Sequence, residues 1–260
     1  MKITILTLFP SFFEGFLGNS IIKRAIAKGV VEVECVQIRD YTKDKYGRTD
    51  TPPIGGGAGL IMKCQPIIDA LQDKKTPTSH TVLFSPRGTT YNQKKAQEFS
   101  KMDHLILLCG HYEGIDERVN PYVDELLSIG DYILTGGEVP AMAVADSVIR
   151  LLDGAINNES LKDESFNDNA LEYPQYTEPY DYEGQKVPDI LYSGNHEAIR
   201  KYHRKESLLL TKKYRQDLFD KLELSKQDKK LLAEAKSSET PKWEQEALEK
   251  GHKFIKKKED

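Results

Sequence analysis

The feature that most constrains the fold is an alternation of short apolar runs with segments of helical periodicity. Strands are expected at residues 2–8, 31–38, 82–84 and 105–109. Helices are expected at residues 20–29, 66–72, 92–102 and 138–152. Because the connections between the strands have crossover length, the pattern predicts an α/β fold with a mostly parallel sheet.

A glycine-framed stretch, Ser128 to Pro140, has the sequence SIGDYILTGGEVP. The apolar run Tyr132 to Leu134 lies between Gly130 and the pair Gly136-Gly137, and glycines permit sharp backbone reversals. Pro140 falls in the first turn of the following helix, where proline is tolerated. We therefore expect a loop, a few extended residues, a second loop and a helix. Such a segment exposes main-chain polar groups and suits a flat, neutral heterocycle better than a triphosphate.

Two further loops follow predicted strands directly. Residues 110–118, GHYEGIDER, come after the apolar run 105–109, and residues 85–88, SPRG, come after 82–84. Ligands of open α/β sheets bind at the carboxyl ends of the strands. Three junctions of this kind predict one pocket. Residues 55–59, GGGAG, lack the lysine of a phosphate-binding loop, so a turn is favoured over phosphate binding there.

Composition restricts the class of protein. The 260-residue chain has no apolar run near the ~20 residues of a membrane span, and it shows no export signal, so a cytoplasmic location is expected. Its three cysteines, Cys35, Cys64 and Cys109, are far apart and are expected to be reduced. Cys109 and His111 alone do not make a zinc site, and no metal ligands are predicted.

Charge is unevenly distributed. Residues 1–195 carry 19 Lys and Arg against 28 Asp and Glu, whereas residues 196–260 carry 18 against 13. A basic C-terminal part on an acidic body is compatible with local phosphate contacts, and equally with solvated helix faces. The polar segment 157–170 has the composition of a flexible linker.

The sequence thus divides into a domain at 1–156, a linker at 157–170 and a mainly α-helical domain at 171–260. Within the last part, Asn195 is a candidate N-cap, and Ser225 with Asp228 forms a candidate capping box. The lysine-rich C-terminal tail is expected to be partly disordered.

Three motifs carry a resemblance to a known family. LFP at residues 8–10, GHYEGIDER and SIGDYILTGGE, in this order, resemble the bacterial tRNA (guanine-N1)-methyltransferases, the TrmD family of the SPOUT class. The resemblance extends from Met1 to about residue 236. It implies that a trefoil knot closes the C-terminal part of the sheet domain. It also implies methyl transfer from S-adenosyl-L-methionine to N1 of the guanine immediately 3′ of the anticodon, position 37, which prevents frameshifting.

The resemblance assigns a set of residues to the methyl donor. They are Ser85, Pro86, Gly110, Tyr112, Glu113, Gly114, Ser128, Ile129, Gly130, Asp131, Tyr132, Ile133, Leu134, Gly136, Gly137 and Pro140.

Catalytic roles follow from the same resemblance. The family has an aspartate directly before Ser-Phe as general base, but here Glu164 holds that place and Asp163 precedes it. Either carboxylate can serve, and the sequence does not decide between them. Arg150 is the candidate to stabilise negative charge on the base. Glu113 is the candidate contact for the donor's sulfonium or for Mg²⁺, which the family requires.

The tRNA is expected to contact Ser165 and one basic helix face. On that helix Arg200, Lys201, Arg204 and Lys205 follow each other at i, i+1, i+4 and i+5. The family forms its site from two chains, so a homodimer is expected. Two alternatives stay open: a related methyltransferase acting on another nucleotide, and a tRNA-binding protein without activity.

Overall fold

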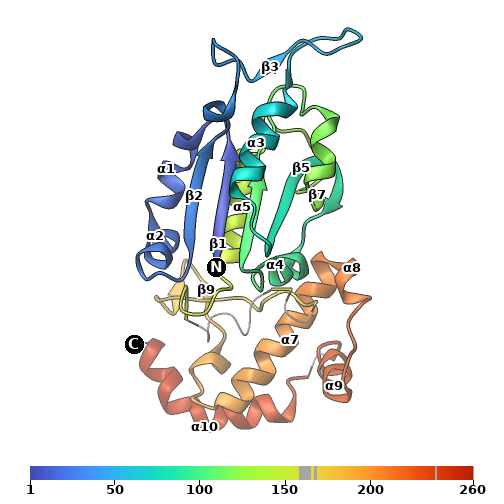
Figure 1. The fold of residues 1–260 in the computed structure, drawn as a ribbon. Helices are drawn as coiled ribbons and strands as arrows, with labels where there is room; N and C mark the ends of the chain where they lie inside the picture. The colour runs from blue at the N-terminus through green and yellow to red at the C-terminus, as the bar shows by residue number, and fades with distance from the viewer. Residues whose placement is uncertain (158–164, 167–168, 238, 260) are drawn as a thin grey trace. The chain divides into compact units, whose positions relative to one another are not determined.

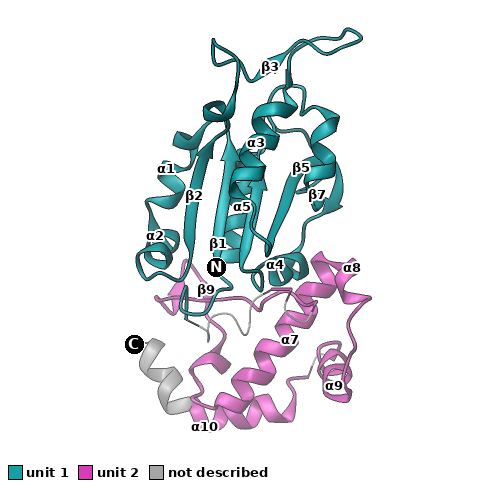
Figure 2. Cartoon of the chain, in the orientation of Figure 1, with its two compact units in different colours: residues 1–161 teal, residues 162–260 magenta. Residues whose placement is uncertain are grey.

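The computed structural model describes residues 1–157, 165–166, 169–237 and 239–259, with side chains up to Gly251. These residues form two compact units, 1–161 and 162–260 (Figure 2). Within the described part of the chain, none of the helices combines the length and the apolar character needed to cross a lipid bilayer. Asp163 and Glu164 lie outside the described residues.

A five-stranded sheet forms the centre of the first unit. Its strands are β1 (Lys2–Thr7), β2 (Glu32–Gln37), β5 (Ser79–Thr90), β6 (His104–Leu108) and β7 (Glu125–Ser128). Their order is β2-β1-β6-β5-β7, and all of these neighbours pair in parallel. The α/β fold with a mostly parallel sheet is therefore confirmed.

Alternate residues of the central strands face opposite layers. Leu105 and Leu107 of β6 pack in one core cluster, and Ile106 and Leu108 pack in the other. This is the period of two expected when both faces of a strand are buried. The helices of this unit are α1 (Glu14–Leu17), α2 (Ser20–Ala27), α3 (Cys64–Lys74), α4 (Gln93–Phe99) and α5 (Glu138–Ile149). Helices α3 and α5 cover opposite faces of the sheet (Figure 1).

The strand predictions were correct for β1, β2 and β6 and incomplete elsewhere. The strand expected at 82–84 extends over Ser79–Thr90, with a register shift between Phe84 and Thr89. This shift accommodates the loop that we expected at 85–88. Strand β7 was not predicted, because four residues are too few for a periodic signal. Residues 132–134 are not a strand, and Ile133 is 83 % exposed.

Short turns of 3-10 helix follow three of the strands. They are η1 (Pro10–Phe13) after β1, η2 (Ile38–Tyr41) after β2 and η3 (Glu117–Tyr122) after β6. Between η2 and α3 the chain projects beyond the carboxyl ends of the strands (Figure 1). The small antiparallel pair β3 (Asp50–Thr51) and β4 (Ile61–Met62) closes the base of this projection.

The second unit contains α7 (His196–Tyr214), α8 (Gln216–Phe219), α9 (Lys226–Glu234) and α10 (Lys242–Glu259). A turn, η4 (Asp189–Tyr192), and the hairpin β8 (Asp181–Tyr182) with β9 (Gln185–Lys186) precede these helices. The expected caps are present, since Asn195 accepts from the Ala198 amide at 3.2 Å and Ser225 with Asp228 forms the capping box. The tail that we expected to be partly disordered is helix α10 in the structure.

Candidate active site

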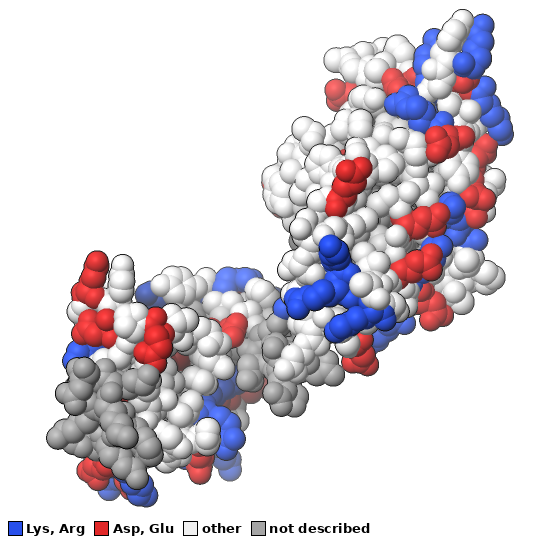
Figure 3. All heavy atoms as spheres, turned by 90° about the vertical axis from the view of Figure 1, so that its left-hand side faces the viewer, with Lys and Arg blue, Asp and Glu red and all other residues white. Residues whose placement is uncertain are grey.

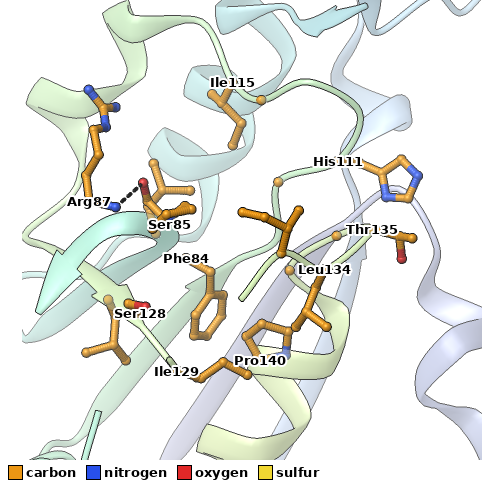
Figure 4. Close-up of a pocket in the computed structure, with 18 of the residues that line it drawn as sticks. Phe84, Ser85, Arg87, His111, Ile115, Ser128, Ile129, Leu134, Thr135 and Pro140 are labelled. Carbon is orange, nitrogen blue, oxygen red and sulfur yellow. Dashed lines mark hydrogen bonds between the residues drawn. The ribbon is translucent and has the colours of Figure 1, made fainter. Parts of the chain in front are cut away.

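A cavity of about 600 Å³ lies at the carboxyl ends of β6 and β7 and beside the register shift of β5. Three stretches of chain line it, within residues 83–87, 110–120 and 127–140. Phe84, Ile129, Leu134 and Pro140 gather around one part of the hollow, whereas Arg87 and His111 lie at its two sides (Figure 4). A mainly apolar cavity of this size with a few polar groups is typical of small-molecule sites.

Most of the residues that the sequence assigned to the methyl donor come together here. Fifteen of the sixteen line the cavity, and the exception is Asp131, which is exposed outside it. Residues that line the cavity but were not predicted are Leu83, Phe84, Arg87, His111, Ile115, Glu117, Asn120, Leu127 and Thr135. Their positions beside the predicted motifs could have indicated several of them, but a side chain's direction depends on the folded backbone.

Close backbone packing joins two walls of the cavity. The Gly137 amide donates to the Gly110 carbonyl at 2.8 Å, and a Cβ on Gly137 would lie 2.7 Å from the Cα of Cys109. Gly136 pairs with His111 in an isolated antiparallel bridge. Only glycine fits at this approach, so the glycines of the 128–140 stretch hold that loop against the strand β6.

A buried carboxylate supports the same loop from behind. Glu138 is 4 % exposed in the first turn of α5, and it accepts from the Thr7 hydroxyl at 2.8 Å. Its second oxygen lies 3.9 Å from Nδ1 of His111. A carboxylate is also favourable near a helix N-terminus. Glu138 thereby connects the end of β1 with the loop after β6.

An ion pair forms on the cavity wall between two unpredicted residues. The Arg87 guanidinium donates to both oxygens of Glu117, at 3.2 and 3.0 Å. The pKa of the Glu117 carboxyl is lowered mainly by these hydrogen bonds. The main-chain amide of Arg87 also donates to the Ser85 hydroxyl at 3.2 Å (Figure 4). The 85–88 loop is thus joined to η3.

Glu113 is held against residues 55–59 of the projection, which we call the glycine loop. Its amide donates to the Leu60 carbonyl at 3.1 Å, and Met62 donates to the Gly114 carbonyl at 2.9 Å. A Cβ on Gly59 would lie 2.3 Å from Cγ of Glu113. The glycine loop therefore packs directly on the predicted sulfonium contact, a role for these glycines that the sequence did not indicate.

Arg150 does not line the cavity of its own chain. It caps the C-terminal end of α5, whereas Pro140 lines the cavity at the other end of that helix. Ten residues separate the two positions, or about 15 Å at the α-helical rise. Ser165 accepts from the Glu172 amide at 2.9 Å within the second unit.

The predicted basic face of α7 divides into two parts. Arg200, Lys201 and Arg204 line a hollow of about 490 Å³ together with Glu197, Ser225, Gln227 and Asp228. In this hollow Arg204 pairs with Asp228 at 2.8 Å. Lys205 is instead enclosed, with its side chain 12 % exposed and paired to Glu244 at 3.1 Å.

The cysteines are free thiols, as predicted. Burial raises the pKa of Cys35 to about 11 and also raises that of Cys109. Among the described residues no group of three or more His, Cys, Asp or Glu could hold a metal ion.

Comparison with known proteins identifies the family. The sequence profile described as tRNA (guanine-1)-methyltransferase TrmD matches residues 1–221. The chain belongs to the TrmD family. A TrmD-family relative from Clostridium perfringens strain SM101, named tRNA (guanine-N(1)-)-methyltransferase, is 53 % identical over 234 residues, which are 89 % of this chain and 99 % of the relative.

Two further relatives carry the same name. The protein of Malacoplasma penetrans is 52 % identical over 221 residues, 85 % of this chain and 98 % of that protein. The protein of Dictyoglomus turgidum is 50 % identical over 237 residues, 91 % of this chain and 97 % of that protein. Family membership thus extends over both units of the structure.

Proposed function

We propose that this protein transfers the methyl group of S-adenosyl-L-methionine to N1 of the guanine immediately 3′ of the tRNA anticodon. The observation that supports the donor site is the cavity, where fifteen predicted residues from three separate loops meet. Loop main chain at Gly110 and in 128–137 offers amides and carbonyls to a purine edge. Phe84, Leu134 and Pro140 offer apolar contact to its faces.

The donor supplies an electrophilic methyl group, and the protein must make guanine N1 a nucleophile. N1 carries a proton at neutral pH, so a carboxylate must accept it as the methyl group is transferred. We assign this role to Asp163 or Glu164, which precede Ser165-Phe166 as the family's base does. Negative charge then develops on the base O6, and a guanidinium such as Arg150 stabilises it.

The position of Arg150 supports a site built from two chains. On the outer side of α5, Val139 is 44 % exposed and Ala143 is also exposed, and the exposed Asp146 follows them toward Arg150. The apolar first half of this outer side is suited to contact with a second chain. Part of the surface of the first unit also carries few charged side chains (Figure 3). Two antiparallel α5 helices in a homodimer would bring the Arg150 of one chain to the cavity of the other.

The cavity loops also support the knotted topology of the family. The chain leaving β7 returns to β6, where Gly137 bonds to Gly110, before it enters α5. We infer that this passage runs through the preceding loop as a trefoil knot. Such a knot explains why successive glycines are needed where two chain segments cross at main-chain distance.

We assign tRNA contact to the second unit, at Arg200, Lys201 and Arg204 around their hollow. Phosphate contacts of this kind give affinity with little sequence information. Ser165 is assigned to the RNA as well. Lys205 is better explained as a structural residue, because its ammonium group lies 5.1 Å from the Tyr202 ring and pairs with Glu244.

Glu113 is a suitable contact for a hydrated Mg²⁺. Mg²⁺ keeps several of its waters and needs only one or two carboxylates, which fits a single exposed glutamate at the cavity. We assign the Glu113 carboxylate to contact a positive charge beside the donor, either the sulfonium of the donor itself or the hydrated Mg²⁺.

The function is tested by methylation of tRNA transcripts that carry guanine or adenine at position 37. Incorporation is expected only into the guanine transcript, and digestion followed by mass spectrometry is expected to yield 1-methylguanosine. Another methylated nucleoside would support the related-enzyme alternative. Failure to bind S-adenosylmethionine in calorimetry would contradict the enzymatic proposal.

Asp163→Asn and Glu164→Gln, made separately, identify the general base. The variant that lacks the base is expected to lose about 10²- to 10⁴-fold in kcat with donor affinity retained. Asp153→Asn, which removes an exposed carboxylate earlier in the same connection, is the matched control and is expected to keep full activity.

A further inference from the structure

The projection between η2 and α3 begins with a turn that is rich in basic residues. We call residues 42–48, TKDKYGR, the basic turn. Its Lys43, Lys45 and Arg48 are exposed, and Arg48 pairs with the one acid of the turn, Asp44, at 3.0 Å. Lys43 pairs with Asp69 of α3 at 2.8 Å. Lys and Arg side chains also gather on the projecting end of the first unit in Figure 3. The turn follows η2 at the carboxyl ends of the strands, the same end of the sheet as the cavity (Figure 1).

An exposed aromatic ring stands among these cations. Tyr46 is 70 % exposed. Nζ of Lys45 lies 4.8 Å from the centre of its ring, and Cζ of Arg48 lies 5.2 Å from it. A tyrosine between two cations on a projecting turn combines a stacking surface with charges for phosphate.

Hydrogen bonds hold the shape of the turn although it projects. The Asp44 carbonyl accepts from the Gly47 amide at 2.9 Å, and its carboxylate accepts from the Tyr46 amide at 2.9 Å. Gly47 has a positive φ of 71°, and its carbonyl accepts from Arg39 at 2.7 Å. A turn held in this way loses little conformational entropy on binding, so its exposed ring is suited to recognition.

Hydrogen bonds join the projection to the wall of the cavity. After β3 and the glycine loop, the chain bonds through Leu60 to Glu113 and through Met62 to Gly114, and both of these partners line the cavity. The projection that carries the basic turn is therefore hydrogen-bonded to the wall of the donor cavity. A macromolecule whose reacting base enters the cavity would extend toward the turn.

We propose that the basic turn is an RNA-binding surface, where Tyr46 stacks on an unpaired nucleotide of the substrate and Lys45 and Arg48 contact the adjacent phosphates. Single-stranded RNA is recognised in this way, by bases stacked on aromatic rings beside cations. This inference rests on the proposed function and deepens it, because it names a tRNA contact in the first unit rather than the second. A protein partner is disfavoured, because the turn offers one ring among charges and no apolar patch.

The test measures tRNA affinity for Tyr46→Ala, Tyr46→Phe and the double variant Lys45→Ala/Arg48→Ala by fluorescence anisotropy over a range of salt concentrations. Tyr46→Ala is expected to weaken binding roughly tenfold, and Tyr46→Phe to bind like the wild type, because the ring is kept. The double variant is expected to bind more weakly and to lower the salt dependence by about two released counterions.

Lys94→Ala/Lys101→Ala is the matched control, since both lysines are exposed in the first unit in and after α4, and α4 lies toward the amino ends of the strands (Figure 1). It removes the same charge and is expected to keep the wild-type salt dependence. All variants are expected to bind S-adenosylmethionine like the wild type, and the turn variants are expected to raise KM for tRNA with kcat unchanged.

Unchanged tRNA affinity in Tyr46→Ala and in the double variant would overturn the proposal, as would equal losses in Tyr46→Phe and Tyr46→Ala. The two proposals fail differently. A wild-type protein that binds tRNA without methylating it contradicts the function alone, whereas methylation that is indifferent to the turn contradicts this inference alone.

Discussion

At the residue scale, glycines hold the candidate site together. Gly137 permits the crossing of two loops, and Gly59 leaves room for the side chain of Glu113. Both roles depend on a missing Cβ, but Gly59 also has a positive φ of 78°. Substitution there carries a steric cost and a backbone cost, and the two can be separated within the same loop.

Gly59→Ala is expected to lower kcat/KM roughly ten- to a hundredfold, because the new Cβ displaces Glu113 from the cavity. The unfavourable φ adds about 1 kcal/mol of destabilisation. Steady-state methylation and urea unfolding measure the two effects.

Gly56→Ala is the control, because it also has a positive φ, 87°, but its Cβ would meet nothing within 4 Å. It is expected to lose similar stability and to keep its activity. Equal activity losses in the two variants would show that loop strain, and not displacement of Glu113, is responsible.

At the element scale, the sheet contains a buried histidine that links stability to pH. His104 begins β6, and its Nε2 lies 2.9 Å from the Thr4 hydroxyl of β1. Burial and then the positive charge of Lys2 lower the pKa of His104 below its ordinary value of 6.5. The folded protein thus holds this histidine neutral at a pH where the unfolded chain already binds a proton.

The wild-type protein is therefore expected to lose free energy of unfolding as the pH falls from about 7 through 6.5 and toward the lower folded pKa. The His104→Asn variant has no histidine to protonate at this place. At pH 8 its free energy of unfolding is expected to be about 1 kcal/mol below that of the wild type, because the hydrogen bond is altered. This difference is expected to shrink at pH 5.5, where the wild type has itself lost stability. Urea unfolding of both proteins at the two pH values measures this. A deficit that does not change with pH would contradict the prediction.

At the scale of the whole molecule, α5 separates two parts of the proposed chemistry. Pro140 borders the donor cavity at one end, and Arg150 follows the other end about 15 Å away. Within one chain the donor cavity and Arg150 therefore lie at opposite ends of the same helix, and in the proposed homodimer a second copy of the chain would supply the arginine.

Mixed dimers test this arrangement. Arg150→Ala and a cavity variant, Leu134→Arg, are each expected to be inactive alone, the second through loss of donor binding in calorimetry. Refolded together, they are expected to recover about a quarter of wild-type activity, because a mixed dimer has one intact cavity facing one intact arginine.

The unmixed proteins and a mixture prepared without refolding are the controls, and light scattering is expected to give twice the chain mass of 29.5 kDa. Absence of recovery in verified mixed dimers would mean that cavity and arginine act within one chain.

Local sequence patterns predicted most of the elements. The continuous apolar run 105–109 indicated a buried strand, and Asn195 and Ser225 indicated helix starts, because apolar runs and caps are short-range properties. The four-residue β7 and the extension of β5 beyond Phe84 could not be predicted, since both depend on pairing with a distant strand.

The sequence by itself determined the parallel α/β sheet, the caps and the motifs of the donor loops, because these depend on neighbouring residues and on recurring residue patterns. The sequence also predicted that the three loops share a pocket. Only the tertiary structure decided which further side chains line it, that Glu138 joins Thr7 behind it, and that Lys205 is enclosed while Arg200 is exposed. The contact between Thr7 and Glu138 joins residues 131 positions apart, which no local pattern can predict. Helical spacing places Lys205 near Arg200, but it does not show that a neighbouring element covers Lys205.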